Sequence, residues 1–159
     1  MQLVVQLAVW NGKKYLPYLF ESLVSQTFKD WHLMIIDNNS SDGSSEWLST
    51  QVLKYKIANT YFVQPKNLGF AGGHNFLFNE VCTKFIDAEY VLLLNQDMCL
   101  EADCFEKLIQ FADQHTDVGA ISPRLMRWDF EKEKTKVIDT LGLKVFSTRR
   151  AVDWLTGCQ

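Results

Sequence analysis

Two acidic residues follow apolar runs in this sequence, in positions where a carboxylate can take part in binding chemistry. Asp37 directly follows residues 31–36, and Asp97 follows residues 90–94 after a short polar step that begins with Asn95. A carboxylate can accept hydrogen bonds from a pyrimidine imide N–H or a ribose hydroxyl, and it can ligate a hard cation that neutralises a diphosphate. One such residue is commonly only a helix cap or a turn residue. Two of them together predict a shared site for a nucleotide and a divalent cation.

The apolar run at residues 90–94 is the stretch around which we expect the fold to be organised. Five apolar or aromatic residues are too few for an ordinary helix, and polar residues follow at once. This pattern is typical of a strand buried on both faces, in the middle of a mostly parallel sheet. Ligands of open α/β sheets bind outside the carboxyl ends of the strands, where Asn95 and Asp97 would lie. The alternative is a polar loop that only terminates the strand.

Strand-like and helix-like patterns alternate along the chain. The apolar runs that predict strands are residues 3–9, 31–36, 61–64, 90–94 and 118–122, with a short strand within residues 141–146. The amphipathic stretches that predict helices are residues 14–26, a segment through Leu48 that Ser41 or Asp42 caps, a segment through Val81, and residues 102–115. Strict alternation predicts an α/β fold, with a mostly parallel sheet and helices on both faces. The charged residues 129–134 predict a solvated loop.

The glycine-bearing segment from Lys66 to Asn75 is a second candidate for anion binding. A loop that leads into a helix can hold an anion through its backbone N–H groups, and Lys66 and His74 would add positive charge or donors. The segment is not a GxGxxG motif after the first strand, and no Gly-Lys-Ser/Thr follows, so dinucleotide-binding and Walker-type loops do not fit. A tight turn with a helix cap explains the local residues equally well.

The composition is that of a globular protein without a nucleic-acid or membrane-spanning signature. The 159 residues are 47% hydrophobic, and 16 Lys and Arg against 19 Asp and Glu give a formal charge of −3. This charge predicts no nucleic-acid partner, and no apolar run is long enough to span a bilayer. The four cysteines form no CxxC pair, and the amino-terminal residues show no leader-like pattern. We therefore expect a cytoplasmic protein with reduced thiols.

Five motifs, taken in order, resemble one family of enzymes. They are residues 9–16 (VWNGKKYL), 23–28 (LVSQTF), 35–43 (IIDNNSSDG), 67–75 (NLGFAGGHN) and 93–97 (LLNQD). They resemble the family 2 inverting glycosyltransferases with the GT-A fold, and the last two narrow the resemblance to the rhamnosyltransferase-like branch. The resemblance covers nearly the whole chain. It implies an enzyme that moves a sugar from a nucleoside-diphosphate donor onto a glycan or lipid-linked acceptor, in the cytoplasm at the inner face of the membrane.

The resemblance also assigns residues to the donor site. The residues that would contact the nucleotide or line the donor pocket are Val9, Asn11, Asp37, Asn39, Lys66, Gly69, Asn75, Asn95 and Gln96. Asp97 would be the last residue of a DxD-type motif and would bind Mg²⁺ or Mn²⁺. Asn95 departs from that motif, because an amide is a weaker ligand for these cations than a carboxylate. Either the metal affinity is lower, or the cation is held by Asp97 and the diphosphate alone.

The acceptor side of such an enzyme is not recognisable here. Residues 153–157 resemble the segment where the acceptor-side half of family members begins, so we expect residues 1–159 to be the donor-binding domain of a truncated enzyme whose general base lies downstream. Asp103, Asp129 and Asp139 are more simply surface or capping acids. A truncated domain would expose an apolar patch and associate as a homo-oligomer. The alternatives are a non-catalytic nucleotide-binding or assembly module and, on weaker grounds, a Rossmann-type oxidoreductase.

Overall fold

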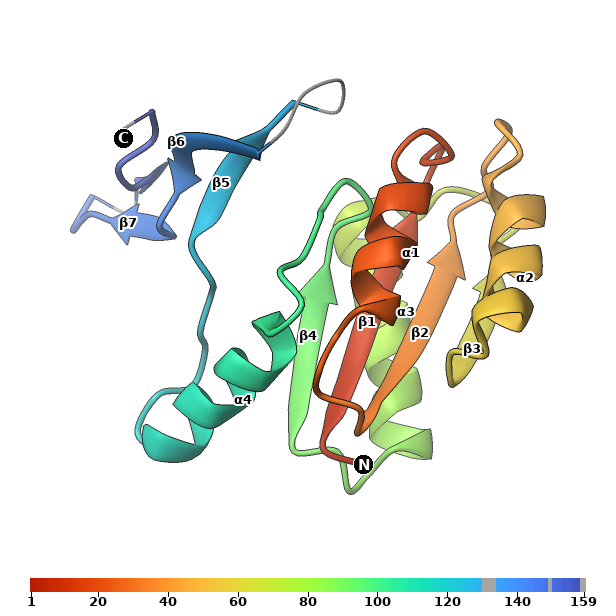
Figure 1. The fold of residues 1–159 in the computed structure, drawn as a ribbon, viewed down its shortest axis with the longest axis horizontal. Helices are drawn as coiled ribbons and strands as arrows, with labels where there is room; N and C mark the ends of the chain where they lie inside the picture. Colours follow the sequence, from red (N-terminus) through yellow and green to blue (C-terminus); the bar gives the residue numbers. More distant parts are fainter. Residues whose placement is uncertain (130–133, 149, 158–159) are drawn as a thin grey trace. The chain divides into compact units, whose positions relative to one another are not determined.

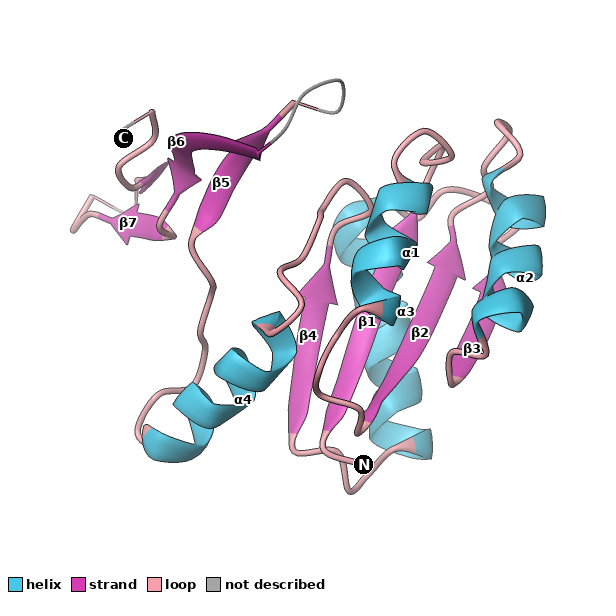
Figure 2. Cartoon of the chain, viewed as in Figure 1, coloured by secondary structure: helices cyan, strands magenta, loops and turns pink. Residues whose placement is uncertain are grey.

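The computed structural model describes residues 1–129, 134–148 and 150–157 of the chain. The chain forms two compact units, Met1–Glu106 and Lys107–Gln159. The first unit contains a four-stranded sheet with helices, and the second contains two small antiparallel hairpins (Figures 1 and 2). Each unit therefore has its own architecture.

Strands and helices alternate through the first unit, as the sequence predicts. The strands are β1 (Leu3–Val9), β2 (Trp31–Asp37), β3 (Asn59–Val63) and β4 (Tyr90–Leu94). The helices are α1 (Leu16–Val24), α2 (Ser44–Tyr55) and α3 (Gly69–Lys84), and α4 (Cys104–Gln114) begins at the end of the unit. All four strands are parallel, in the order β3-β2-β1-β4. Helices α1 and α2 cover one face of the sheet and α3 covers the other (Figure 1), which confirms the predicted α/β class.

The register of the sheet brings the carboxyl ends of three strands to one edge. Val9 at the end of β1 pairs with Asp37 at the end of β2. Leu7, two residues earlier in β1, pairs with Leu94 at the end of β4. Because β1 lies between β2 and β4, the loops that follow these three strands are neighbours. The sheet thus places the polar segments of the sequence at one common edge.

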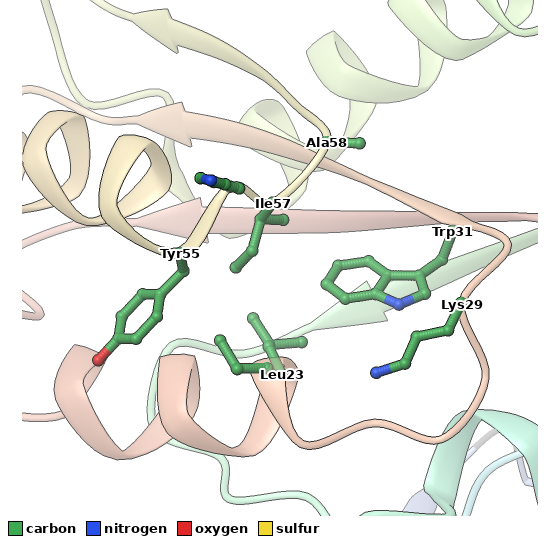
Figure 3. A pocket seen from close by; sticks show the side chains of 8 residues that line it. Leu23, Lys29, Trp31, Tyr55, Ile57 and Ala58 are labelled. Carbon is green, nitrogen blue, oxygen red and sulfur yellow. The ribbon is translucent and has the colours of Figure 1, made fainter.

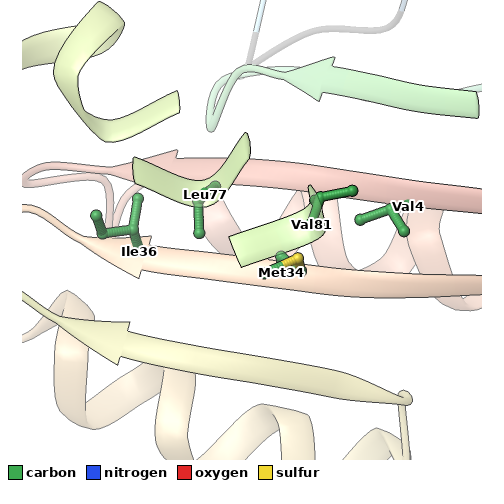
Figure 4. Packing of buried hydrophobic residues seen from close by; sticks show 5 residues of the cluster. All are labelled: Val4, Met34, Ile36, Leu77 and Val81. Atoms are coloured by element: carbon green, nitrogen blue, oxygen red, sulfur yellow. The ribbon is translucent and has the colours of Figure 1, made fainter. Parts of the chain in front are cut away.

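The hydrophobic core has one layer on each face of the sheet. On the α3 side, Leu77 and Val81 pack on alternate strand residues, Val4, Met34 and Ile36, and all five are buried (Figure 4). Successive side chains of a strand point to opposite faces. The intervening residues, such as Leu7 and Ile35, therefore point toward α1 and α2, and they are fully buried as well. This two-sided burial explains why β1 and β2 are nearly continuous apolar runs.

Strand β4 is an edge strand, so the prediction that it lies in the middle of the sheet is wrong. The strand pairs with β1 alone within the four-stranded sheet, and Leu93 is 55% exposed. Val91 and Leu93 pair with Val4 and Gln6 of β1 and point to the same face of the sheet, which is the α3 side. Helix α3 itself lies over β1 and β2. An apolar run indicates that a strand can be buried on both faces, but it does not indicate where in the sheet the strand lies. The α3 side of β4 therefore forms an exposed apolar surface.

The second unit departs further from the sequence prediction. Its strands are β5 (Leu125–Trp128) with β6 (Lys134–Thr140), and β7 (Leu143–Val145) with β8 (Ala151–Asp153), and both pairs are antiparallel. Strand β7 lies within the segment where a short strand was predicted. The strand predicted at residues 118–122 is wrong, because these residues are irregular and mostly exposed. Gly119 weakens that run, and strand pairing begins only after Pro123. Residues 130–133 of the predicted charged loop lie outside the described residues.

Candidate functional site

Three loops meet at the carboxyl edge of the sheet: residues 10–12 after β1, residues 38–43 after β2 and residues 95–97 after β4. Hydrogen bonds between side chains and backbone connect the first loop to each of the other two. Backbone groups at the ends of strands lack sheet partners, so side chains must satisfy them. The candidate site is therefore a preassembled set of loops rather than a set of independent ones.

Asp37 is the most deeply buried acid in this edge, with 1% of its surface exposed. Its Oδ2 accepts a hydrogen bond of 3.1 Å from the backbone N–H of Ser40. Its Oδ1 is buried and has no hydrogen-bond partner in the structure. An unsatisfied buried acceptor costs free energy, because its hydration is lost without replacement. A donor group of a ligand would satisfy Oδ1, so this oxygen marks a candidate binding position.

The loop after β1 is held against the loop after β2 by Asn11. Its backbone N–H donates to Ser40 Oγ at 3.0 Å, and its side-chain Oδ1 accepts from the Ser41 N–H at 2.8 Å. Asn11 and Asn39 both have a left-handed backbone, with φ values of 49° and 63°. Asparagine tolerates this conformation better than most residues, which explains its use at both turns. Asn11 therefore shapes the site, and its side-chain oxygen is already occupied.

A second connection between the same two loops runs through Asp42. Its carboxylate accepts the Lys13 N–H at 3.0 Å and the Ser44 N–H at 3.0 Å, and Ser44 Oγ in turn accepts the Gly12 N–H at 3.0 Å. Burial raises the pKa of the Asp42 carboxyl, but the hydrogen bonds from Ser44 and Lys13 outweigh it and leave the pKa below its usual value. Helix α2 begins at Ser44 with Gly43 as its N-cap residue, so the prediction that Ser41 or Asp42 is the cap is wrong, although Asp42 accepts the first N–H of the helix.

Gln96 connects the loop after β4 to the loop after β1. Its Oε1 accepts the Trp10 N–H at 3.0 Å, and its Nε2 donates to the Trp10 carbonyl at 3.1 Å. The side-chain amide thus pairs with the backbone as a strand would. Gln96 was predicted to contact the nucleotide, and this stays a prediction; in the structure both ends of its amide bind Trp10.

The glycine-bearing segment forms the start of α3, and its polar residues differ in burial. Gly69 has a φ of 71° and donates its N–H to Asn67 Oδ1 at 2.7 Å. Lys66 and Asn75 are exposed. His74 is buried, its Nδ1 lies 3.3 Å from the side-chain amide of Gln6, and burial lowers its pKa. The lowered pKa does not favour the predicted positive charge of His74, whereas its buried Nε2 has no hydrogen-bond partner, so its role as a donor stays a prediction.

Asp97 and Asn95, the predicted metal-site segment, both lie at the same edge of the sheet. In the ranges that the structure describes, no three His, Cys, Asp or Glu side chains are grouped so that they could hold a metal ion. Mg²⁺ is usually bound by one or two carboxylates together with substrate phosphates. Asp97 thus fits a cation that is shared with a bound diphosphate, and it does not fit a metal ion held by protein side chains alone.

The structure also draws attention to Trp10, which the sequence analysis did not assign to the site. It is 53% exposed although it lies between the buried end of β1 and the turn at Asn11. An exposed indole can stack on a nucleobase. The signal in the sequence was an aromatic residue directly after a buried strand.

Of the predicted residues, Val9 is buried in β1, and Asn11, Asp37, Asn39, Asn95, Gln96 and Asp97 share the carboxyl edge.

A separate pocket of about 260 Å³ lies away from this edge (Figure 3). It is lined by residues at the ends of α1 and α2 and at the starts of β2 and β3: Leu23, Val24, Lys29, Trp31, Tyr55, Lys56, Ile57 and Ala58. Ligands of parallel α/β sheets bind at the opposite ends of the strands. The pocket and the loops that carry Asp37 and Asp97 are therefore at opposite ends of the sheet.

Among the described residues, no helix combines the length and the apolar character that crossing a membrane requires.

One family model matches nearly the whole chain: Glycosyl transferase family 2, over residues 5–157. Among curated proteins, the minor teichoic acid biosynthesis protein GgaB of Bacillus subtilis is 25% identical over 113 residues, which are 70% of this chain and 12% of that protein. An uncharacterized glycosyltransferase of Haemophilus influenzae is 27% identical over 107 residues, which are 67% of this chain and 40% of that protein. The chain thus spans less than half the length of the curated relatives it matches.

Solved structures of larger proteins share the fold. TarS of S. aureus in complex with UDP-GlcNAc superposes with a TM-score of 0.64 at 19% identity, over 79% of this chain and 38% of that chain. The mannosyltransferase PcManGT of Pyrobaculum calidifontis, in complex with GDP-Man and Mn²⁺, superposes with a TM-score of 0.63 at 14% identity, over 79% of this chain and 34% of that chain. At these identities the similarity shows a common fold, which is the GT-A fold that the sequence predicts.

Proposed function

This chain belongs to glycosyl transferase family 2, and from that premise we propose that it binds the nucleotide-sugar donor of a glycosyltransferase. The reaction moves the sugar from a nucleoside diphosphate onto a glycan or lipid-linked acceptor, with inversion at the anomeric carbon. A pyrimidine nucleotide, either UDP or dTDP, is the donor that the site supports best. The resemblance to the rhamnosyltransferase-like branch favours dTDP, whereas the fold neighbour TarS has been solved with UDP.

The observation that carries this proposal is the unsatisfied Oδ1 of Asp37 inside a connected set of loops. The imide N–H of uracil or thymine is a donor that matches such an acceptor. Trp10, exposed after the neighbouring strand, offers a face for stacking on the same base. An acceptor and an aromatic side chain at the ends of two neighbouring strands are a suitable arrangement for a pyrimidine.

Asp97 is the group that we assign to the diphosphate end of the donor. A divalent cation, Mg²⁺ or Mn²⁺, supplies charge neutralisation for the departing diphosphate when it is bound. Asp97 would hold this cation together with the phosphate oxygens, and the exposed Lys66 and Asn75 would face the donor from the α3 side. The residues of this chain thereby bind and orient the donor, which is the part of catalysis that comes from positioning.

A second candidate function is a non-catalytic nucleotide-binding module. Inverting transfer requires a general base on the acceptor hydroxyl. Asp139, one of the acids considered for that role, instead lies 3.4 Å from Arg127 in an exposed ion pair. Because this ion pair engages Asp139, the observation favours the module. The oxidoreductase alternative has no support, because the family match is to a glycosyl transferase.

A thermal-shift titration tests the proposal. UDP, dTDP and GDP are added to the chain with and without Mn²⁺, and the same titrations are made on Asp97→Asn and on Asp87→Asn, an acid just before the amino end of β4. A ligand at about 100 times its Kd adds about 2.7 kcal/mol to the unfolding free energy, which raises the melting temperature by several degrees. We expect a metal-dependent rise with a pyrimidine nucleotide that Asp97→Asn loses and Asp87→Asn keeps. The absence of a rise with all three nucleotides would refute a working donor site.

A further inference from the structure

The side chain of Gln96 takes the place of a strand just beyond the point where the pairing of β4 with β1 ends. The ladder between the two strands ends with Leu7 paired to Leu94. Three residues further along the first strand's direction, the Trp10 N–H and carbonyl would otherwise lack a partner on that side. The Gln96 amide supplies both, with its Oε1 at 3.0 Å and its Nε2 at 3.1 Å. We call these two hydrogen bonds the Gln96–Trp10 pair.

Gly12 makes room for this pair. A Cβ atom built on Gly12 would lie 2.4 Å from Gln96 Oε1 and 2.8 Å from Gln96 Cδ, so a side chain at this position would displace the Gln96 amide. The φ of Gly12 is not in the left-handed region, so its backbone could be adopted by alanine. The glycine therefore permits the close approach of the Gln96 amide, and its own backbone conformation does not call for glycine. Two independent features of the chain thus serve the same contact.

We propose that Gln96 is a positioning residue that sets the place of Asp97 relative to the loops that carry the base-binding residues Trp10 and Asp37. The proposal rests on the proposed donor site. Asp97 follows Gln96 directly, so the pair with the Trp10 backbone anchors the carboxylate that would hold the cation. On its other side, the loop of Trp10 is anchored to the β2 loop through Asn11 and Ser40. The pair therefore completes a line of hydrogen bonds from the Asp97 loop to Asp37.

This role predicts a specific pattern of binding. Uridine has no phosphates, so it depends on the base-binding loops, which keep their own connections through Asn11 and Asp42. UDP with Mn²⁺ depends in addition on the distance between those loops and Asp97. Loss of the pair should therefore reduce the gain in UDP affinity that Mn²⁺ provides, and it should leave uridine affinity nearly unchanged. A residue that only supports folding would weaken both ligands alike.

The test is a double-mutant cycle on the full chain with Gln96→Ala, Gly12→Ala and the double variant, with uridine, UDP, and UDP plus Mn²⁺ as ligands in calorimetric titrations. Gly119→Ala is the matched control, because nothing lies within 4 Å of a Cβ at that position. Gly12→Ala displaces the Gln96 amide, whereas Gln96→Ala vacates the space that the added methyl group needs. In each single variant, the factor by which Mn²⁺ raises UDP affinity should fall about tenfold, since two hydrogen bonds are broken. The double variant should lose no more than either single one.

The outcomes separate this inference from the donor-site proposal. If the wild type binds UDP with a gain from Mn²⁺ and Gln96→Ala keeps that gain, the positioning role is refuted while the donor site stands. Losses that add in the double variant, or equal losses for uridine and UDP, would also refute it. If the wild type binds none of the ligands, the donor site and the positioning role fall together. A melting temperature for each variant shows whether it is folded. If Gln96→Ala is unfolded, Gly12→Ala alone still tests the positioning role.

Discussion

Asp37→Asn should change stability and nucleotide affinity in opposite directions. In the folded chain Asp37 is 1% exposed, with Oδ2 bound to the Ser40 N–H and Oδ1 without a partner. Asparagine has the same shape, and its Oδ1 can accept the Ser40 N–H in place of the carboxylate oxygen. The substitution removes a buried carboxylate whose side chain accepts one hydrogen bond, from the Ser40 N–H. We therefore expect the free energy of unfolding to rise by about 1 kcal/mol.

The same substitution presents an amide N–H where the base would present its own N–H. A hydrogen bond to a charged acceptor contributes about 1.5–3 kcal/mol, so its loss should weaken UDP or dTDP binding about 10- to 150-fold. Urea denaturation followed by tryptophan fluorescence measures the first effect, and calorimetric titration measures the second. Asp139→Asn, in an exposed ion pair with Arg127, is the control and should change neither quantity appreciably. Destabilisation of Asp37→Asn together with unchanged nucleotide affinity would refute the reasoning, because Asp37 would then be a structural turn residue.

Three further predictions concern the scaffold of the site. Leu77→Ala empties part of the fully buried layer under α3 and should cost about 2–5 kcal/mol in urea denaturation, and a cost below about 1 kcal/mol would contradict the described packing. Asp42→Ala removes the carboxylate at the start of α2 and should lower the free energy of unfolding by about 1 kcal/mol. An unchanged free energy of unfolding would show that this carboxylate does not stabilise the helix. Burial lowers the pKa of His74 below its ordinary value of 6.5, so the unfolded chain binds the proton first and stability should fall as the pH drops below about 6.5. His74→Gln should reduce this fall between about pH 7.5 and about pH 5.5, and an unchanged pH dependence would show that His74 is not its source.

The fold of the first unit could be predicted because its signals are local. Strand β1 was predicted with its observed bounds, Leu3–Val9, since a run of apolar residues between turn residues has few other uses. Helices α1 and α4 were predicted from their periodicity, with ends that differ by a few residues. The sequence also predicted that Asp37 and Asp97 lie at the same edge of the sheet, because parallel strands bring their carboxyl ends to one edge.

What could not be predicted depends on contacts between distant parts of the chain. The edge position of β4 is set by which strands pair with β1, and no pattern within Tyr90–Leu94 encodes it. His74 resembles an exposed donor in a glycine loop, but helix α3 turns it onto Gln6 of the sheet. The Gln96 amide is directed at Trp10, 86 residues away in sequence. Polar residues that satisfy the backbone and polar residues that bind a ligand look alike until their partners are known.

Amide chemical-shift mapping with UDP and Mg²⁺ tests the central claim most directly, since it locates the bound nucleotide on the chain. The account predicts that the largest shifts occur in residues 10–13, 38–41 and 95–97, and that the shifts in residues 95–97 require the metal. Shifts centred instead on Leu23, Trp31 and Tyr55, at the pocket on the opposite end of the sheet, would contradict the assignment of the donor site. A spectrum that UDP leaves unchanged would contradict donor binding itself.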